Sequence, residues 1–137
     1  MNKHTFKKEE RLCNKRRIDS LFHNGSSFIV YPLRAIYLVE LPARPQMTPL
    51  EVLISVPKKR FRKAVSRNRV KRLIKEAYRL EKSPLRSFLE AQSLHLSLAI
   101  QYVGTEELPL PDLLAKIRQL TSRIEDELSK SYLGQSH

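Results

Sequence analysis

The sequence predicts an α/β protein in which helices pack on one small sheet, an α+β sandwich. Two patterns indicate this class. Stretches in which every second residue is apolar, typical of strands, alternate along the chain with stretches whose apolar residues recur every three to four positions, typical of helices. A length of 137 residues fits a single domain. The expected order is αβββαβα, with about four strands and about three helices.

The chain divides into an arm, a domain and a tail. Residues 1–13 are expected to form a mobile basic arm, residues 14–131 the globular domain and residues 132–137 a tail. A lone cysteine, Cys13, excludes an intramolecular disulfide and fits a cytoplasmic protein. The sequence has no run of about 18 apolar residues, so we expect no membrane span.

The first half of the domain predicts one helix and up to three strands. Asn14 is placed to cap the helix and Gly25 to end it. Its apolar positions, spaced i, i+3 and i+4, are Ile18, Leu21 and Phe22. Residues 28–40 are rich in β-formers, and Pro32 predicts either two short strands or an edge position. A proline-rich loop over 41–50 precedes a strand over 52–56.

The second half predicts a helix, a strand and a helix. The helix runs to Ser83-Pro84, which either breaks it or begins a short helical turn over 85–89. Alternating apolar residues then predict a strand: Leu94, Leu96, Leu98, Ile100 and Tyr102. The last helix has a continuous apolar stripe: Leu113, Ile117, Leu120, Ile124 and Leu128.

The basic residues are clustered. The chain has 26 Lys and Arg against 14 Asp and Glu, a formal net charge of +12. Residues 58–79 contain eleven of these cations and one acid, Glu76. The cations are Lys58, Lys59, Arg60, Arg62, Lys63, Arg67, Arg69, Lys71, Arg72, Lys75 and Arg79. Such a segment indicates a nucleic-acid partner, because each neutralised phosphate releases condensed counterions. An anionic membrane surface is the alternative; clustering argues against mere solubilisation.

The basic segment has helical periodicity with two different faces. Its apolar stripe, which can pack on the sheet, comprises Val70, Leu73, Ile74, Ala77 and Tyr78. The opposite face presents Asn68, Arg72, Lys75 and Arg79. A solvated face usually mixes charge signs, and a calmodulin-type or membrane-surface helix needs apolar residues on its free face. Neither description fits, whereas phosphate contacts explain a wall of like charges.

The run RNRVKRLIKEAYR over 67–79, preceded by Lys58-Lys59 and Ala64-Val65, resembles the signature of the bacterial ribonuclease P protein subunit. Similarity extends over roughly residues 6–128, including Phe6-Lys7-Lys8 and Ile54-Ser55-Val56. Arg60 to Arg62 replaces the glycine-containing turn of many members.

The resemblance implies the protein component of an endoribonuclease that removes the 5′ leader of precursor tRNA. Its catalytic RNA carries the Mg²⁺-dependent chemistry, so the protein itself is expected to have no catalytic or metal-binding residues. The partners are that RNA and precursor tRNA, with no membrane and no obligate protein partner. A left-handed βαβ crossover is also implied, an exception to the usual hand.

The resemblance implies two RNA surfaces. The first docks on the catalytic RNA through Lys58, Lys59, Arg67, Asn68, Arg69, Lys71, Arg72, Lys75 and Arg79. The second is a cleft for the leader between the first helix and the sheet, formed by Ile18, Phe22 and Tyr37. From the residues alone, a place in the core is the better explanation of Phe22 and Tyr37.

Other functions fit the residues less well. The four histidines are scattered and lack the spacing of a zinc site. A structural RNA-binding protein, such as a ribosomal component, would share the composition but not the 67–79 run. A DNA-binding regulator would need base-reading side chains, and the outward face offers only Asn68.

Overall fold

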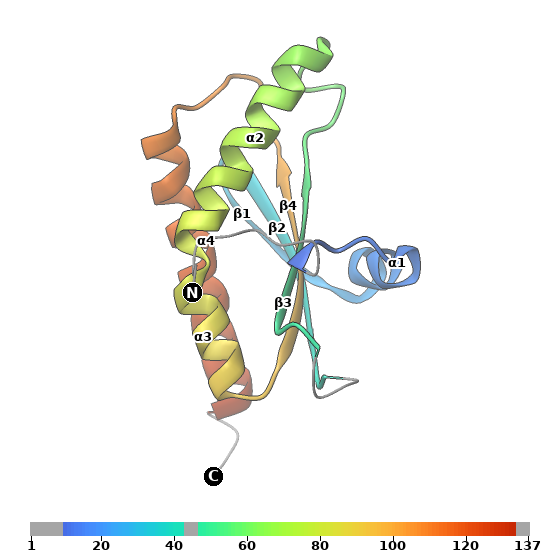
Figure 1. The fold of residues 1–137 in the computed structure, drawn as a ribbon, viewed down its shortest axis with the longest axis vertical. Helices are drawn as coiled ribbons and strands as arrows, with labels where there is room; N and C mark the ends of the chain where they lie inside the picture. The colour runs from blue at the N-terminus through green and yellow to red at the C-terminus, as the bar shows by residue number, and fades with distance from the viewer. Residues whose placement is uncertain (1–9, 43–46, 134–137) are drawn as a thin grey trace.

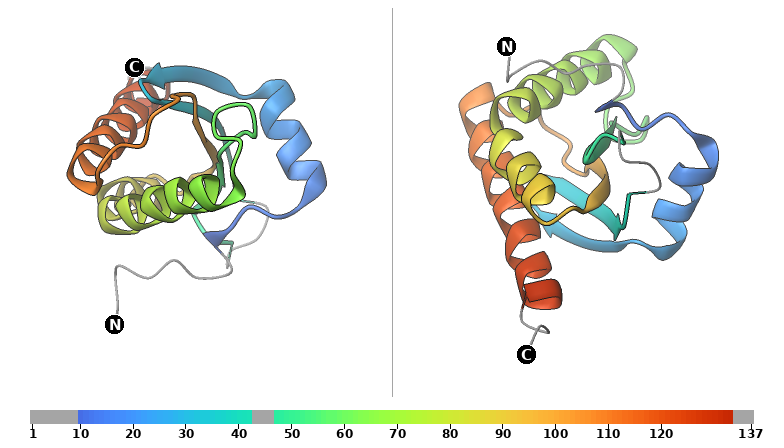
Figure 2. Two further views of the ribbon diagram at one scale, coloured as in Figure 1. Left: turned by 90° about the horizontal axis from the view of Figure 1, so that it is seen from above. Right: turned by 60° about the horizontal axis from the view of Figure 1, so that its bottom comes forward.

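A computed structural model describes residues 10–42 and 47–133 (Figure 1). A four-stranded sheet separates one helix on one face from three helices on the other, as the view from above makes plain (Figure 2). The helices are α1 (Lys15–Asn24), α2 (Ala64–Glu81), α3 (Ser83–Ala91) and α4 (Leu110–Leu128), which a π-helical turn, η2 (Ser129–Leu133), extends. The strands are β1 (Ser26–Val30), β2 (Leu33–Glu40), β3 (Leu50–Ser55) and β4 (His95–Tyr102). The predicted α+β class is confirmed.

The sheet is mixed, in the order β1-β2-β4-β3. β2 pairs antiparallel with both β1 and β4, while β3 pairs parallel with β4. Parallel neighbours need a crossover, and here α2 and α3 supply it. Its left hand stays a prediction of the resemblance. Pro32 separates β1 from β2, so the two-strand interpretation of residues 28–40 is confirmed.

The number of helices differs from the prediction. The segment after Ser83-Pro84 is a helix of nine residues, not a single turn, so the described residues contain four helices. Proline is favoured in the first turn of a helix, where its missing N–H has no helical partner. Leu85 and Leu89 are fully buried, and this packing stabilises a helix that propensity alone leaves undecided.

The predicted arm is too long by four residues. Leu12 is buried, and its N–H donates to the Val52 carbonyl, 2.8 Å away, on the otherwise free edge of β3. Glu10 is also buried and pairs with Lys82. Residues 10–13 therefore belong to the domain, because they cover an open sheet edge and place an apolar side chain under α1. Residues 1–9 lie outside the described part of the chain.

Two apolar clusters hold the layers together. The larger fills the space between the sheet and the α2–α4 layer, and the smaller joins α1 to the other face through Leu12, Leu21, Ile36 and Ala99. Gly25 follows α1 where a Cβ would lie 2.4 Å from the Leu21 carbonyl oxygen and 2.9 Å from that of Tyr37. A side chain there would force α1 away from β2.

Candidate nucleic-acid interface

One face of α2 is fixed in the core and the opposite face is free. Val70, Ile74, Ala77 and Tyr78 are buried against the sheet and α4, as the apolar stripe predicted. Leu73, at the margin of the stripe, is only partly buried. The orientation of the helix is therefore determined by its apolar stripe, and its cations are presented to solvent.

The predicted docking residues fall into two groups by exposure. Six are exposed: Lys58, Lys59, Asn68, Arg69, Arg72 and Lys75. Three are partly buried: Arg67, Lys71 and Arg79. Figure 1 shows the loop before α2 leading into the upper end of that helix, so the set comes from two adjoining parts of the fold.

Three of these arginines already have partners within the protein. Arg67 donates to the carbonyl oxygens of Phe61, at 3.0 Å, and Arg62, at 2.9 Å, and so holds the loop that carries the other cations. Arg69 pairs with Glu107 at 3.0 Å, and Arg79 with Glu76 at 2.6 Å. Within residues 10–42 and 47–133, Lys58, Lys59, Lys71, Arg72 and Lys75 form no ion pair.

The positive charges along α2 favour the binding of an anion. Lys63 at its N-cap makes no side-chain hydrogen bond to the helix, and no acid lies in the first turn. Cations at the positive end of a helix dipole are unfavourable, whereas a phosphate there is favourable. Further along, burial and the nearby charges of Lys71 and Arg11 lower the pKa of Lys75. Phosphates on this face would relieve repulsion that the protein itself does not neutralise.

Helix α1 carries a small apolar surface that is at least partly exposed. Phe22 is 44% exposed, which excludes the core interpretation for its ring. Ile18, one turn earlier on the same face of α1, is partly buried beside the cluster under the helix. An exposed aromatic ring next to an aliphatic side chain is a surface on which a base can stack.

Tyr37 does not belong to that surface, so the predicted cleft is wrong in this residue. Side chains alternate across a strand, and Tyr37 points to the α4 side of the sheet while its neighbour Ile36 points to α1. Its ring packs edge-on against Phe28, with centroids 6.0 Å apart. Burial and the carboxylate of Glu127 on α4 raise its pKa, consistent with that location.

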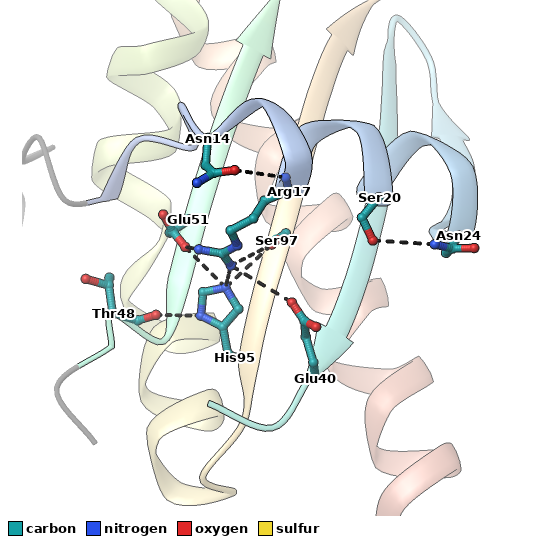
Figure 3. Close-up of polar contacts among 9 residues, drawn as sticks. All are labelled: Asn14, Arg17, Ser20, Asn24, Glu40, Thr48, Glu51, His95 and Ser97. Atoms are coloured by element: carbon teal, nitrogen blue, oxygen red, sulfur yellow. Dashed lines mark hydrogen bonds and ion pairs between the residues drawn. The ribbon is translucent and has the colours of Figure 1, made fainter. Parts of the chain in front are cut away.

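A polar network under α1 escaped prediction (Figure 3). Arg17 reaches from α1 to the sheet, where it donates to Glu51 and to His95 Nε2, and to Ser97 Oγ at 3.2 Å. His95 is 1% exposed and its Nδ1 donates to the Thr48 carbonyl, 2.6 Å away. Burial above all, with the neighbouring Arg17, lowers the pKa of His95, which keeps Nε2 free to accept. The network fixes α1, and with it Phe22, on the sheet.

A second unpredicted network joins the N-terminal segment of the domain to the α2–α3 junction. Lys82, 2% exposed at the α2–α3 junction, donates to both carboxylate oxygens of Glu10 at 2.7 Å. Arg86 also donates to this carboxylate, with its Nη1 2.6 Å from Glu10 Oε1. The described residues include no group of three or more His, Cys, Asp or Glu that could hold a metal ion. No helix in the same residues is long and apolar enough to cross a membrane.

Comparison with known proteins supports the predicted family. The family model described as Ribonuclease P matches residues 6–125. The ribonuclease P protein component of Porphyromonas gingivalis is 44% identical over 105 residues, which are 77% of this chain and 73% of that protein. The chain belongs to the ribonuclease P protein family. The ribonuclease P protein component of Chlorobium phaeobacteroides is 35% identical over 136 residues, 94% of this chain and 91% of that protein.

Solved ribonuclease P proteins have the same fold. The Thermotoga maritima protein matches with a TM-score of 0.64 at 20% identity over 83% of this chain and 96% of that one. The Staphylococcus aureus protein matches with a TM-score of 0.62 at 17% identity over 84% and 94%. Ribonuclease P is an endoribonuclease that matures the 5′ end of tRNA, so this chain is the RNA-binding protein component of a ribonucleoprotein hydrolase.

Proposed function

We propose that this ribonuclease P protein docks on its catalytic RNA through α2 and the loop before it. One observation carries the proposal: α2 is held by a buried apolar face, while Arg72 and Lys75 on its opposite face form no ion pair within the described residues. Arg72 and Lys75 lie at the centre of this face, with Lys71 at its margin. Lys58 and Lys59 extend the face along the loop, and Arg67 holds that loop in place.

The substrate in this proposal is precursor tRNA, whose single-stranded leader lies along α1. Ile18 and Phe22 supply an apolar surface on which bases stack without sequence preference. Tyr37 has no part in it. The two surfaces belong to different elements, so one RNA can hold the protein while the other RNA passes along it.

Mg²⁺ belongs to the RNA subunit in this proposal. Mg²⁺ takes oxygen ligands, mainly carboxylates and phosphates. The side chains on the proposed docking face are Lys and Arg, which do not fit as ligands. Their contribution is to neutralise phosphates that would otherwise repel the substrate. We place this work in the cytoplasm, without a membrane or an obligate protein partner.

Phe22→Ala is expected to weaken binding of precursor tRNA by about tenfold, since stacking on one aromatic ring contributes about 1–3 kcal/mol per base. Binding of mature tRNA, which lacks a leader, should not change. The measurement is the Kd of the reconstituted holoenzyme for both RNAs. Leu41→Ala, which also removes an exposed apolar side chain, is the control. Equal losses for precursor and mature tRNA would refute a leader contact.

A further inference from the structure

Three arginines converge on a hollow at the free edge of the sheet. The hollow has a volume of about 640 Å³ and runs along residues 27–29 of the edge strand β1. Arg34 lines it from β2, Arg123 from α4, and Arg60 from the loop before α2. These segments are far apart in sequence, so the fold itself brings the three arginines to one hollow.

Within the described residues, the three arginines lack the carboxylate partners that five other arginines have. Arg17, Arg69, Arg79, Arg86 and Arg118 each pair with a carboxylate. In the part of the chain that the structure describes, the arginines of the hollow form no ion pair. The Nε of Arg60 is buried and has no hydrogen-bond partner among the same residues.

Structural roles account for only part of this arrangement. Arg123 lies over the Phe28 ring, 4.4 Å from its centroid, which is a stabilising cation–π contact. A cation on an edge strand also discourages pairing with another chain. Neither role requires three like charges around one hollow, where they repel one another, nor a buried Nε without an acceptor.

We propose that this hollow binds backbone phosphates of the single-stranded leader of precursor tRNA, an inference that rests on the proposed function. A phosphate among the three arginines would offset the repulsion between them, and guanidinium groups bind phosphate through paired N–H donors. The side chains of Ile29 and Arg34 point to the same side of the sheet as α1, and Ile29 is 57% exposed. A strand whose bases lie on Phe22 and Ile29 can therefore direct its phosphates to the arginines.

The catalytic RNA is the competing source of phosphate, because Arg60 adjoins the docking loop. The position of Arg34 favours the leader. It lies on β2, on the sheet face that α1 covers in part, and not on the side of α2. If the leader supplies the phosphate, the effect of losing an arginine should depend on leader length. If the catalytic RNA supplies it, the effect should be the same for every leader length.

The test compares Arg34→Gln and Arg60→Gln holoenzymes with wild type on precursor tRNAs with a short and a long leader and on mature tRNA. The expected result is a loss of about tenfold per variant for the long leader only, the loss of one charged hydrogen-bonded contact. The negative slope of log affinity against log salt should become shallower by about 0.7 for each arginine removed, which is the contribution of one phosphate contact in a single strand. The control is Arg118→Gln, which removes an arginine on α4 that pairs with Glu81 at the end of α2.

Several outcomes would overturn the inference. Losses that are equal for mature tRNA, or a loss of affinity for the catalytic RNA alone, would assign the hollow to that RNA. Unchanged binding of the long leader would assign the arginines to protection of the sheet edge. A wild-type holoenzyme that gains nothing from a longer leader would overturn the proposed leader path itself, and this inference with it. Arg34→Lys should retain the salt slope and lose part of the affinity, because it keeps the charge without the paired donors.

Discussion

Replacing Lys71, Arg72 and Lys75 with alanine is expected to weaken binding to the catalytic RNA by at least about 100-fold, from three charged contacts at roughly 1 kcal/mol each. The salt dependence should change as well. The negative slope of log affinity against log salt is expected to become shallower by about 2 to 3, because each lost phosphate contact contributes about 0.7 to 0.9. The measurement is a binding titration at several salt concentrations.

The matched control removes three cations elsewhere. Lys116, Arg118 and Lys130 lie on α4 and the turn that follows it, and their loss lowers the net charge by the same amount. If affinity depended on net charge alone, both triple variants would lose the same slope. That result would contradict docking through α2. Unfolding curves on both variants check that the fold is retained, as expected for exposed and partly buried side chains.

Lys82→Met is expected to destabilise the protein by about 3–5 kcal/mol, because it leaves the carboxylate of Glu10 buried without its buried cation. The half-exposed Arg86 stays near that carboxylate and compensates in part. The double change Glu10→Gln with Lys82→Met removes both charges and should cost less than Lys82→Met alone. The measurement is the free energy of unfolding in urea of the wild type, of Lys82→Met and of the double variant.

Arg86→Met is the control for this buried pair. Its side chain is 39% exposed, so removing it should cost no more than about 1 kcal/mol. Equal costs for Lys82→Met and Arg86→Met would contradict the importance of burial. The pair matters for function because it ties residues 10–12 across β3 to the α2–α3 junction, behind the proposed docking face.

Local periodicity predicted both the basic helix α2 and the central strand β4. The stripe from Val70 to Tyr78 places α2 on the sheet, and this alone decides which cations face outward. Alternation in residues 94–102 gives β4, whose side chains are buried on both faces. The α2 prediction holds because a buried face and an exposed face leave different residues at fixed spacings. The β4 prediction holds because large apolar residues alternate with small or polar ones along the strand.

The errors arise where both sides of an element are apolar or where the partner is distant in sequence. Residues 33–39 carry apolar side chains at both odd and even positions, so their pattern cannot decide which face α1 covers, and Tyr37 was misplaced. Glu10 and Lys82 are 72 residues apart, and Arg17 and His95 are 78 apart. No periodic signal links such pairs, because only the three-dimensional topology makes them neighbours.

The sequence also could not distinguish cations that are free to bind RNA from cations that hold the protein's own structure. Arg67 and Arg72 look alike in the sequence, but Arg67 donates to two loop carbonyls and Arg72 faces solvent. A change at Arg67 is therefore expected to disturb the loop as well as the RNA contact. Arg60 resembles its basic neighbours in the same way, and only the fold places it in the hollow at β1.

The most direct test of the account is cleavage of precursor tRNA by protein alone, by the catalytic RNA alone and by the two together at low Mg²⁺. The account predicts a mature 5′ end from the reconstituted pair, much less from the RNA alone under these conditions, and none from the protein. Cleavage by the pure protein without RNA would contradict it, because the cations of α2 would then belong to a catalytic surface and not to a docking surface.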